Sequence, residues 1–118
     1  MSDSIVKTKT FDFAVRIVNL SKILNSKNEC VLSKQILKSG TSIGANTREA
    51  LNAESKPDFI HKLSIAQKEC DETIYWLELL KVTQYINEKE FNSLNNDATE
   101  ILKIVRSIII TSKKSQTP

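Results

Sequence analysis

The sequence predicts an all-α protein, an antiparallel up-down bundle of four helices. Its 118 residues include only 2 Gly and 2 Pro, too few for a turn-rich all-β architecture or a dinucleotide-binding glycine loop. Apolar residues make up 40% and charged residues 26%, which is typical of one folded domain. The apolar residues recur at alternating spacings of three and four, and this spacing keeps them on one stripe of a helix.

The first two helices are expected on either side of a polar break at residues 25–29. The first spans residues 4–25, and its stripe contains Ala14, Ile17, Ser21 and Leu24. The second spans residues 33–53 with Ser33 as its N-cap, and its stripe contains Ile36, Gly40, Ile43, Thr47 and Ala50.

The third and fourth helices have start signals that resemble capping boxes, Ser55 with Asp58 and Asn87 with Glu90. Their stripes run through residues 59–80 and 91–108. Helices of these lengths predict a rod about 30–40 Å long at ~1.5 Å per residue. We expect one bundle domain over residues 1–112, followed by a frayed basic tail over residues 113–118.

The chain shows no secretory signal and no apolar run near the ~20 residues that a membrane span needs. We therefore expect a cytoplasmic protein with no membrane partner. Cys30 and Cys70 could form a disulfide in a secreted chain, but reduced thiols fit the cytoplasm better.

Both glycines, Gly40 and Gly44, lie on one face of the second predicted helix. Each destabilises a helix interior by about 0.8–1 kcal/mol relative to Ala, and close helix packing is the simplest compensation. The alternative is a phosphate-binding loop with Thr41 or Ser42 as a ligand. It lacks the preceding strand and the following Gly-Lys-Ser/Thr.

A second apolar line on the third helix indicates self-association. A single bundle buries one stripe per helix, so this line needs another cover, and we expect a subunit interface. The alternative is a wide core stripe shaded by lysine stems. The candidate interface residues are Tyr75, Leu79, Val82 and Ile86.

The charges are segregated, with net charges of +4 in residues 1–40, −5 in residues 41–100 and +4 in residues 101–118. If the first, second and fourth helices share an exposed edge, they form a basic surface that a cyclic oligomer would repeat as a belt. Such a belt could bind nucleic-acid phosphates without reading bases, whereas the alternative is a merely solvated face. The candidate phosphate-contacting residues are Lys34, Lys38, Lys103, Arg106, Lys113 and Lys114.

No pattern supports catalysis, a metal site or a cofactor. His61, the only histidine, stands three residues after Asp58 and resembles one half of a di-iron carboxylate site. Such sites need two Glu-x-x-His turns, and this chain has one, with Asp in place of Glu, so we expect His61 to be a surface residue. Glu69 and Glu72 are expected to pair with Arg16, Arg48 or lysines. Glu49 is expected to be partly buried beside a cation.

The run Thr41-Ser42-Ile43-Gly44-Ala45-Asn46-Thr47-Arg48-Glu49-Ala50 and the stretch 59–80 resemble the bacterial 23S rRNA intervening-sequence proteins. Gly44 stands where many members have proline. The resemblance implies an antiparallel four-helix bundle that assembles as a ring-like homopentamer, and it implies no catalytic residue. Some members are encoded within insertions in ribosomal RNA genes. A related accessory protein of diversity-generating retroelements is a basic pentameric barrel that binds nucleic acid and a reverse transcriptase.

Two functions follow as hypotheses. The first is a non-enzymatic oligomer that binds RNA or DNA through phosphates. The second is a protein-interaction scaffold, which recruits copies of itself and then another protein. An enzyme is the weakest third hypothesis.

Overall fold

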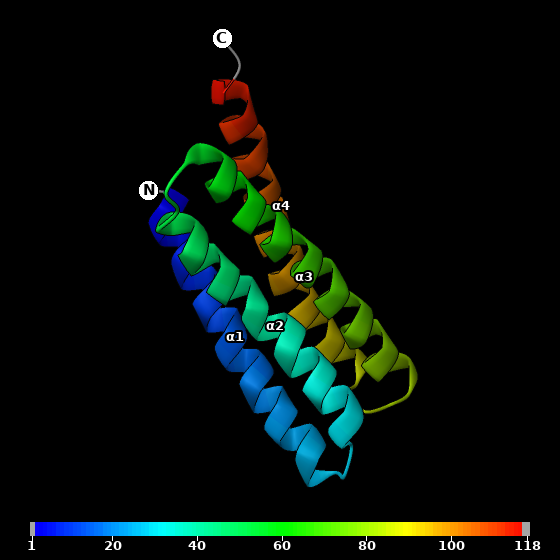
Figure 1. The fold of residues 1–118 in the computed structure, drawn as a ribbon. Coiled ribbons are helices and arrows are strands. Elements are labelled where there is room, and N and C mark those ends of the chain that lie inside the picture. The colour runs from blue at the N-terminus through cyan, green and yellow to red at the C-terminus, as the bar shows by residue number, and fades with distance from the viewer. Residues whose placement is uncertain (1, 117–118) are drawn as a thin grey trace.

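A computed structural model of the chain describes the backbone of residues 2–116 and the side chains of residues 5–115. It contains four helices, α1 (Ser2–Ser26), α2 (Cys30–Leu51), α3 (Lys56–Val82) and α4 (Glu88–Gln116). Residues 2–116 include no strand. Successive helices run in opposite directions (Figure 1), so the prediction of an all-α four-helix bundle is confirmed.

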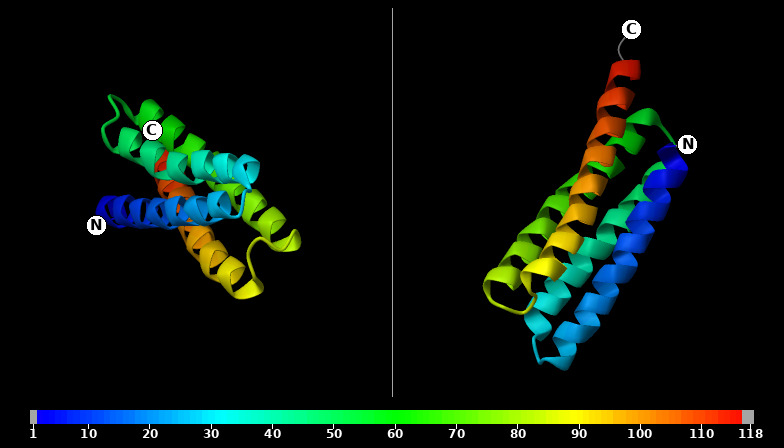
Figure 2. Two further views of the ribbon diagram at one scale, coloured as in Figure 1. Left: turned by 90° about the horizontal axis from the view of Figure 1, so that it is seen from below. Right: turned by 180° about the vertical axis from the view of Figure 1, so that it is seen from behind.

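The helices follow one another around the bundle. α2 packs against α1 and α3, and α4 packs against α3 and more lightly against α1. Within residues 2–116, no Cα atom of α2 lies within 8 Å of one of α4, and the same holds for α1 and α3. The C-terminal end of α4 projects beyond the loop between α2 and α3 (Figures 1 and 2). The molecule measures 53 × 22 × 20 Å, longer than the expected rod, because the 29-residue α4 extends past its neighbours.

The start of α2 corrects the expectation that Ser33 caps it. α2 begins at Cys30, and the Glu29 carboxylate accepts hydrogen bonds from the backbone N–H groups of Val31 (3.0 Å) and Leu32 (2.9 Å). Ser33 is buried instead, and its Oγ lies 2.6 Å from Oγ of Ser21 on α1. Its hydroxyl therefore joins two helices inside the bundle and does not serve a helix end.

The other helix starts follow the sequence signals. Ser55 Oγ accepts a hydrogen bond from the Asp58 N–H (3.2 Å). Asn87 and Glu90 form a reciprocal capping box, with backbone N–H to side-chain oxygen distances of 2.9 and 2.7 Å. The α1–α2 and α3–α4 turns contain no glycine. Asn28 (φ 63°) and Gln84 (φ 69°) adopt the left-handed conformation there, at some steric cost.

The glycines are placed where α1 approaches α2. A Cβ on Gly40 would lie 2.7 Å from Cγ2 of Ile17, which is fully buried. A Cβ on Gly44 would lie 3.3 Å from the Thr10 carbonyl oxygen. The missing side chains thus permit a close approach of the two helices, most strictly at Gly40.

The end of α4 differs from the expected boundary at residue 112. The helix continues to Gln116, so the first four residues of the expected tail are helical. Lys56 Nζ donates a hydrogen bond to Ser115 Oγ (2.6 Å) and connects this end of α4 to the start of α3. Thr117 and Pro118 lie outside the described residues. No helix within residues 2–116 has a stretch long and apolar enough to cross a membrane.

The two cysteines are free and have different surroundings. Cys30 is exposed. Cys70 is fully buried, and its thiol donates a hydrogen bond to the Ala98 carbonyl oxygen (Sγ to O, 3.2 Å). Burial is the main cause that raises the pKa of the Cys70 thiol to about 12. Since only the thiolate reacts rapidly, Cys70 is protected by both burial and protonation.

We expect iodoacetamide at pH 8 to modify one thiol of the folded protein, Cys30, and a second only after unfolding. Intact-mass spectrometry distinguishes one adduct from two. The variant Cys30→Ser serves as the control and should gain no adduct while folded. Rapid modification of this variant without denaturant would contradict the burial of Cys70.

Candidate functional site

The C-terminal half of α4 carries the strongest run of positive charge. From residue 101 onward the chain contains Lys103, Arg106, Lys113 and Lys114 and no acidic residue. Lys103 is exposed beside Ile5 of α1, and Lys114 is exposed near the projecting end of the helix. Arg106 Nη2 lies 3.9 Å from Asp71 Oδ2 on α3, so it is only loosely paired. These four candidates therefore lie on one helix, and Lys103 and Lys114 are exposed to solvent.

The two candidates on α2 lie elsewhere. Lys34 and Lys38 are exposed, and neither takes part in an ion pair among residues 5–115. Because α2 does not pack against α4 within residues 2–116, these lysines form no common patch with the α4 residues within one copy. The shared basic edge of the first, second and fourth helices is therefore not present in the single chain.

Basic residues of α1 are partly neutralised by α4. Lys9 Nζ lies 3.0 Å from Glu100 Oε1, and Arg16 Nη1 lies 2.6 Å from Asp97 Oδ2. Arg16 also donates a hydrogen bond to Ser93 Oγ (2.9 Å). These pairs connect α1 and α4, the neighbouring helices that pack most lightly on each other, so their charges help to hold α4 in place.

The apolar line on α3 is exposed over most of its length. Tyr75 is 57% exposed and Val82 is 76% exposed, while Leu79 is half-buried. Ile86 requires a correction because it lies in the α3–α4 turn, is only 4% exposed and belongs to the core. The exposed line therefore ends at Val82. The Tyr75 ring stands edge-on to Trp76, with ring centroids 5.0 Å apart.

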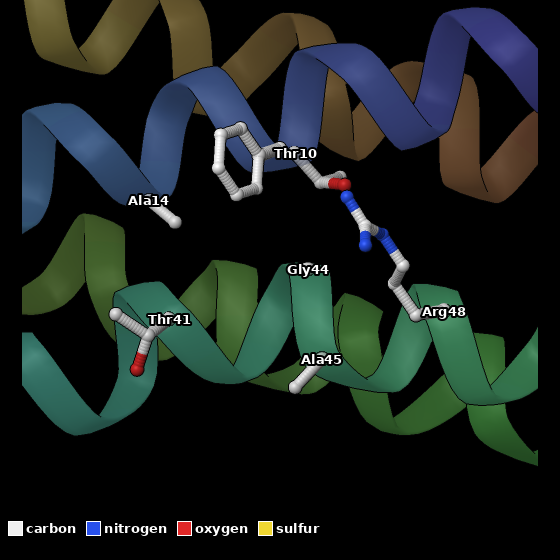
Figure 3. A pocket seen from close by; sticks show the side chains of 7 residues that line it. Thr10, Ala14, Thr41, Gly44, Ala45 and Arg48 are labelled. Carbon is white, nitrogen blue, oxygen red and sulfur yellow. The ribbon is translucent and has the colours of Figure 1, made fainter.

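A groove of about 270 Å³ lies between α1 and α2 (Figure 3). Small residues, Ala14, Gly44 and Ala45, leave its middle open, and Arg48 reaches across from α2. The Arg48 guanidinium carbon lies 5.5 Å from the centre of the Phe11 ring. This close approach is a cation–π contact. Phe11 remains 54% exposed, so the groove has an apolar wall and one fixed cation.

The carboxylates singled out in the sequence have structural partners. Glu49 pairs with Lys62 (2.9 Å), although its side chain is 57% exposed and not partly buried as expected. Glu72 accepts a hydrogen bond from Trp76 Nε1 (3.2 Å), and neither Glu72 nor Glu69 forms an ion pair with Arg16 or Arg48. Partial burial, and then the Glu72 charge, raise the pKa of Glu69. The charges of Lys38 and Lys68 are close enough to Glu69 to lower its pKa, against these larger effects that raise it. His61 is exposed, and residues 5–115 contain no cluster of three metal-ligating side chains.

The α1–α2 groove was not anticipated from the sequence. The small residues at positions 14, 44 and 45 are the sequence feature that could have indicated a groove. Helix periodicity does not show which neighbouring helix a small residue faces, so their pairing could not be inferred. The ion pairs of Lys9 and Arg16 were missed for a related reason. They join residues about eighty to ninety positions apart, and only the packing of α1 against α4 brings them together.

Comparison with known proteins identifies a family and a similar solved structure. The sequence model of the family described as 23S rRNA-intervening sequence protein matches residues 2–107. A crystal structure from Bacteroides thetaiotaomicron VPI-5482, described as a protein with unknown function from the S23 ribosomal protein family, has a TM-score of 0.91 and 61% identity. That match covers 92% of this chain and 98% of the other. No curated protein matches the chain.

Proposed function

Since the chain belongs to the 23S rRNA-intervening sequence protein family, we propose that it is a non-enzymatic, self-associating bundle that binds the phosphates of RNA or DNA. It acts in the cytoplasm. The observation that carries the proposal is the C-terminal half of α4, which has four basic residues, no acidic residue and a projecting end (Figure 2). The α4 basic segment, residues 101–116, is the proposed phosphate contact.

The chemistry of this segment suits phosphates better than bases. Lysine and arginine bind phosphate oxygens regardless of sequence, and the resulting affinity depends on salt because counterions are released. Base stacking is not expected to contribute, because residues 101–116 contain no aromatic side chain.

Self-association strengthens the proposal. A closed homo-oligomer, which the family resemblance suggests is a pentamer, would repeat the α4 basic segment once per copy. Several weak contacts on one nucleic acid then act together, because the second contact forms within an existing complex.

We expect labelled RNA and DNA of mixed sequence to bind with similar affinities, measured by fluorescence anisotropy. Because phosphate contacts release counterions, the affinity should fall roughly tenfold or more between about 50 and 200 mM salt. Lys103→Gln/Lys114→Gln should reduce the slope of log affinity against log salt by about 2 per copy in contact. Lys89→Gln, at the opposite end of α4, is the matched control and should bind as the wild type does.

Three outcomes would contradict phosphate binding: no binding to either nucleic acid at low salt, affinity that does not change with salt, or an equal loss in the Lys89→Gln control.

The exposed line of Tyr75, Leu79 and Val82 favours a second candidate, a protein-interaction scaffold without nucleic-acid binding. Purification of the native complex distinguishes the two. Co-purified nucleic acid supports the first function, and a different protein in stoichiometric amount supports the second.

A further inference from the structure

The α1–α2 groove has one charged group and few free polar groups. The Thr10 hydroxyl donates to the Val6 carbonyl oxygen (2.8 Å), and the Thr41 hydroxyl donates to the Leu37 carbonyl oxygen (2.7 Å). The remaining lining is apolar except for Arg48. The groove therefore suits an apolar or aromatic side chain that has a carboxylate beside it.

The exposed face of the α1–α2 hairpin is positive around this groove. Residues 13–28 and 30–48 contain no acidic residue, and Glu29 between them is used as the α2 N-cap. Lys22, Lys34 and Lys38 are exposed and take part in none of the ion pairs found among residues 5–115. A negatively charged surface is the complement of this face.

The outer face of α3 has the opposite composition. Residues 69–80 contain no basic residue, and three of their four carboxylates stand three or four positions from the exposed Tyr75, on the same side of the helix. Leu79 and Val82 continue the apolar surface by one and two turns. The carboxylates are Glu69, Asp71, Glu72 and Glu78.

Within one copy the two surfaces meet only at their shared border, where the charge of Lys38 on α2 acts on Glu69 of α3 and opposes the rise in its pKa that burial causes. Tyr75 points to solvent, and α1 and α3 have no Cα atoms within 8 Å of each other in the described part of the chain, so Tyr75 does not reach the groove of its own copy. We infer that the α3 face of one copy docks on the α1–α2 groove of a second copy. Tyr75 enters the groove, and the α3 carboxylates face Lys38 and Arg48. This pairing rests on the self-association proposed above and names the surfaces that carry it.

The two surfaces are different, so the contact is heterologous. Each copy keeps one unused groove and one unused α3 face, and assembly continues until a ring closes. Arg106 of the α4 basic segment lies beside Asp71 at the border of the α3 face, and the rest of the segment lies outside both surfaces. It therefore stays available for phosphates in the assembled particle.

Charge reversal tests the pairing by sedimentation velocity of the full chain. Lys38→Glu/Arg48→Glu and Glu72→Lys/Glu78→Lys should each weaken self-association at least tenfold. The quadruple variant, which carries both pairs of changes, should recover it because opposite charges face each other again. Asp12→Lys/Glu54→Lys changes the charge away from both surfaces and should assemble as the wild type does. Circular dichroism confirms that each variant is folded.

A crosslink tests the same contact directly. Ala45→Cys and Tyr75→Cys, each combined with Cys30→Ser, should form a disulfide-linked pair when mixed, and neither should do so alone.

The outcomes separate this inference from self-association itself. A monomeric wild type overturns both. An oligomeric wild type whose mass is unchanged by either reversal, or a quadruple variant that stays dissociated, overturns the pairing alone. Absence of the mixed crosslink in an assembled sample also overturns the pairing.

Discussion

Ile17→Ala is expected to lower the free energy of unfolding by about 2–5 kcal/mol. Ile17 is 0% exposed and lies at the closest approach of α1 and α2, where its side chain faces Gly40. Truncation removes buried methyl groups and leaves a cavity that the rigid bundle fills only partly. Urea denaturation followed by circular dichroism gives the change.

Val15→Ala is the matched control, because Val15 lies on the same helix and is 45% exposed. Its loss should be much smaller. Equal losses for the two variants would contradict the close packing of α1 on α2 at Ile17.

Gly40→Ala is expected to destabilise the protein by about 1–3 kcal/mol through overpacking. The new methyl group would lie 2.7 Å from Ile17 Cγ2, and a buried β-branched side chain has little freedom to move. This loss is larger than the gain of about 0.8–1 kcal/mol in helix propensity. Thermal and urea unfolding of the same sample measure the net effect.

Gly44→Ala provides the comparison, because its Cβ would lie 3.3 Å from the Thr10 carbonyl oxygen and borders an open groove. It should change stability less than Gly40→Ala does. In the double variant Ile17→Ala/Gly40→Ala, the added methyl group occupies part of the cavity. The combined loss should therefore be smaller than the sum by about 0.5–3 kcal/mol, and simple additivity would show that the two residues are not in contact.

The fold was predictable because helix periodicity is local. Neighbouring residues alone determine the apolar stripes of residues 59–80 and 91–108 and the caps at Ser55 and Asn87. Both stripes and both caps appear in α3 and α4 as expected. The start of α2 could not be predicted from local sequence, since Glu29 and Ser33 are both plausible N-caps. The choice was decided by tertiary structure: Ser33 gains a partner in Ser21 on α1 and is buried there.

The candidate site was predictable only in composition. Charge counting found the positive segment of residues 101–118, which α4 presents at its projecting end. It could not show that Lys34 and Lys38 lie on a helix that does not pack against α4 within residues 2–116. Ile86 fits the spacing of an exposed line, yet α3 ends at Val82, so the helical spacing no longer applies beyond it.

Both proposals depend on the bundle having more apolar surface than one copy can bury. Sedimentation equilibrium of the wild-type chain across a wide range of concentrations tests this most directly. We predict a single species with a mass several times the 13.3 kDa of one chain. A mass of one chain at every concentration would contradict it.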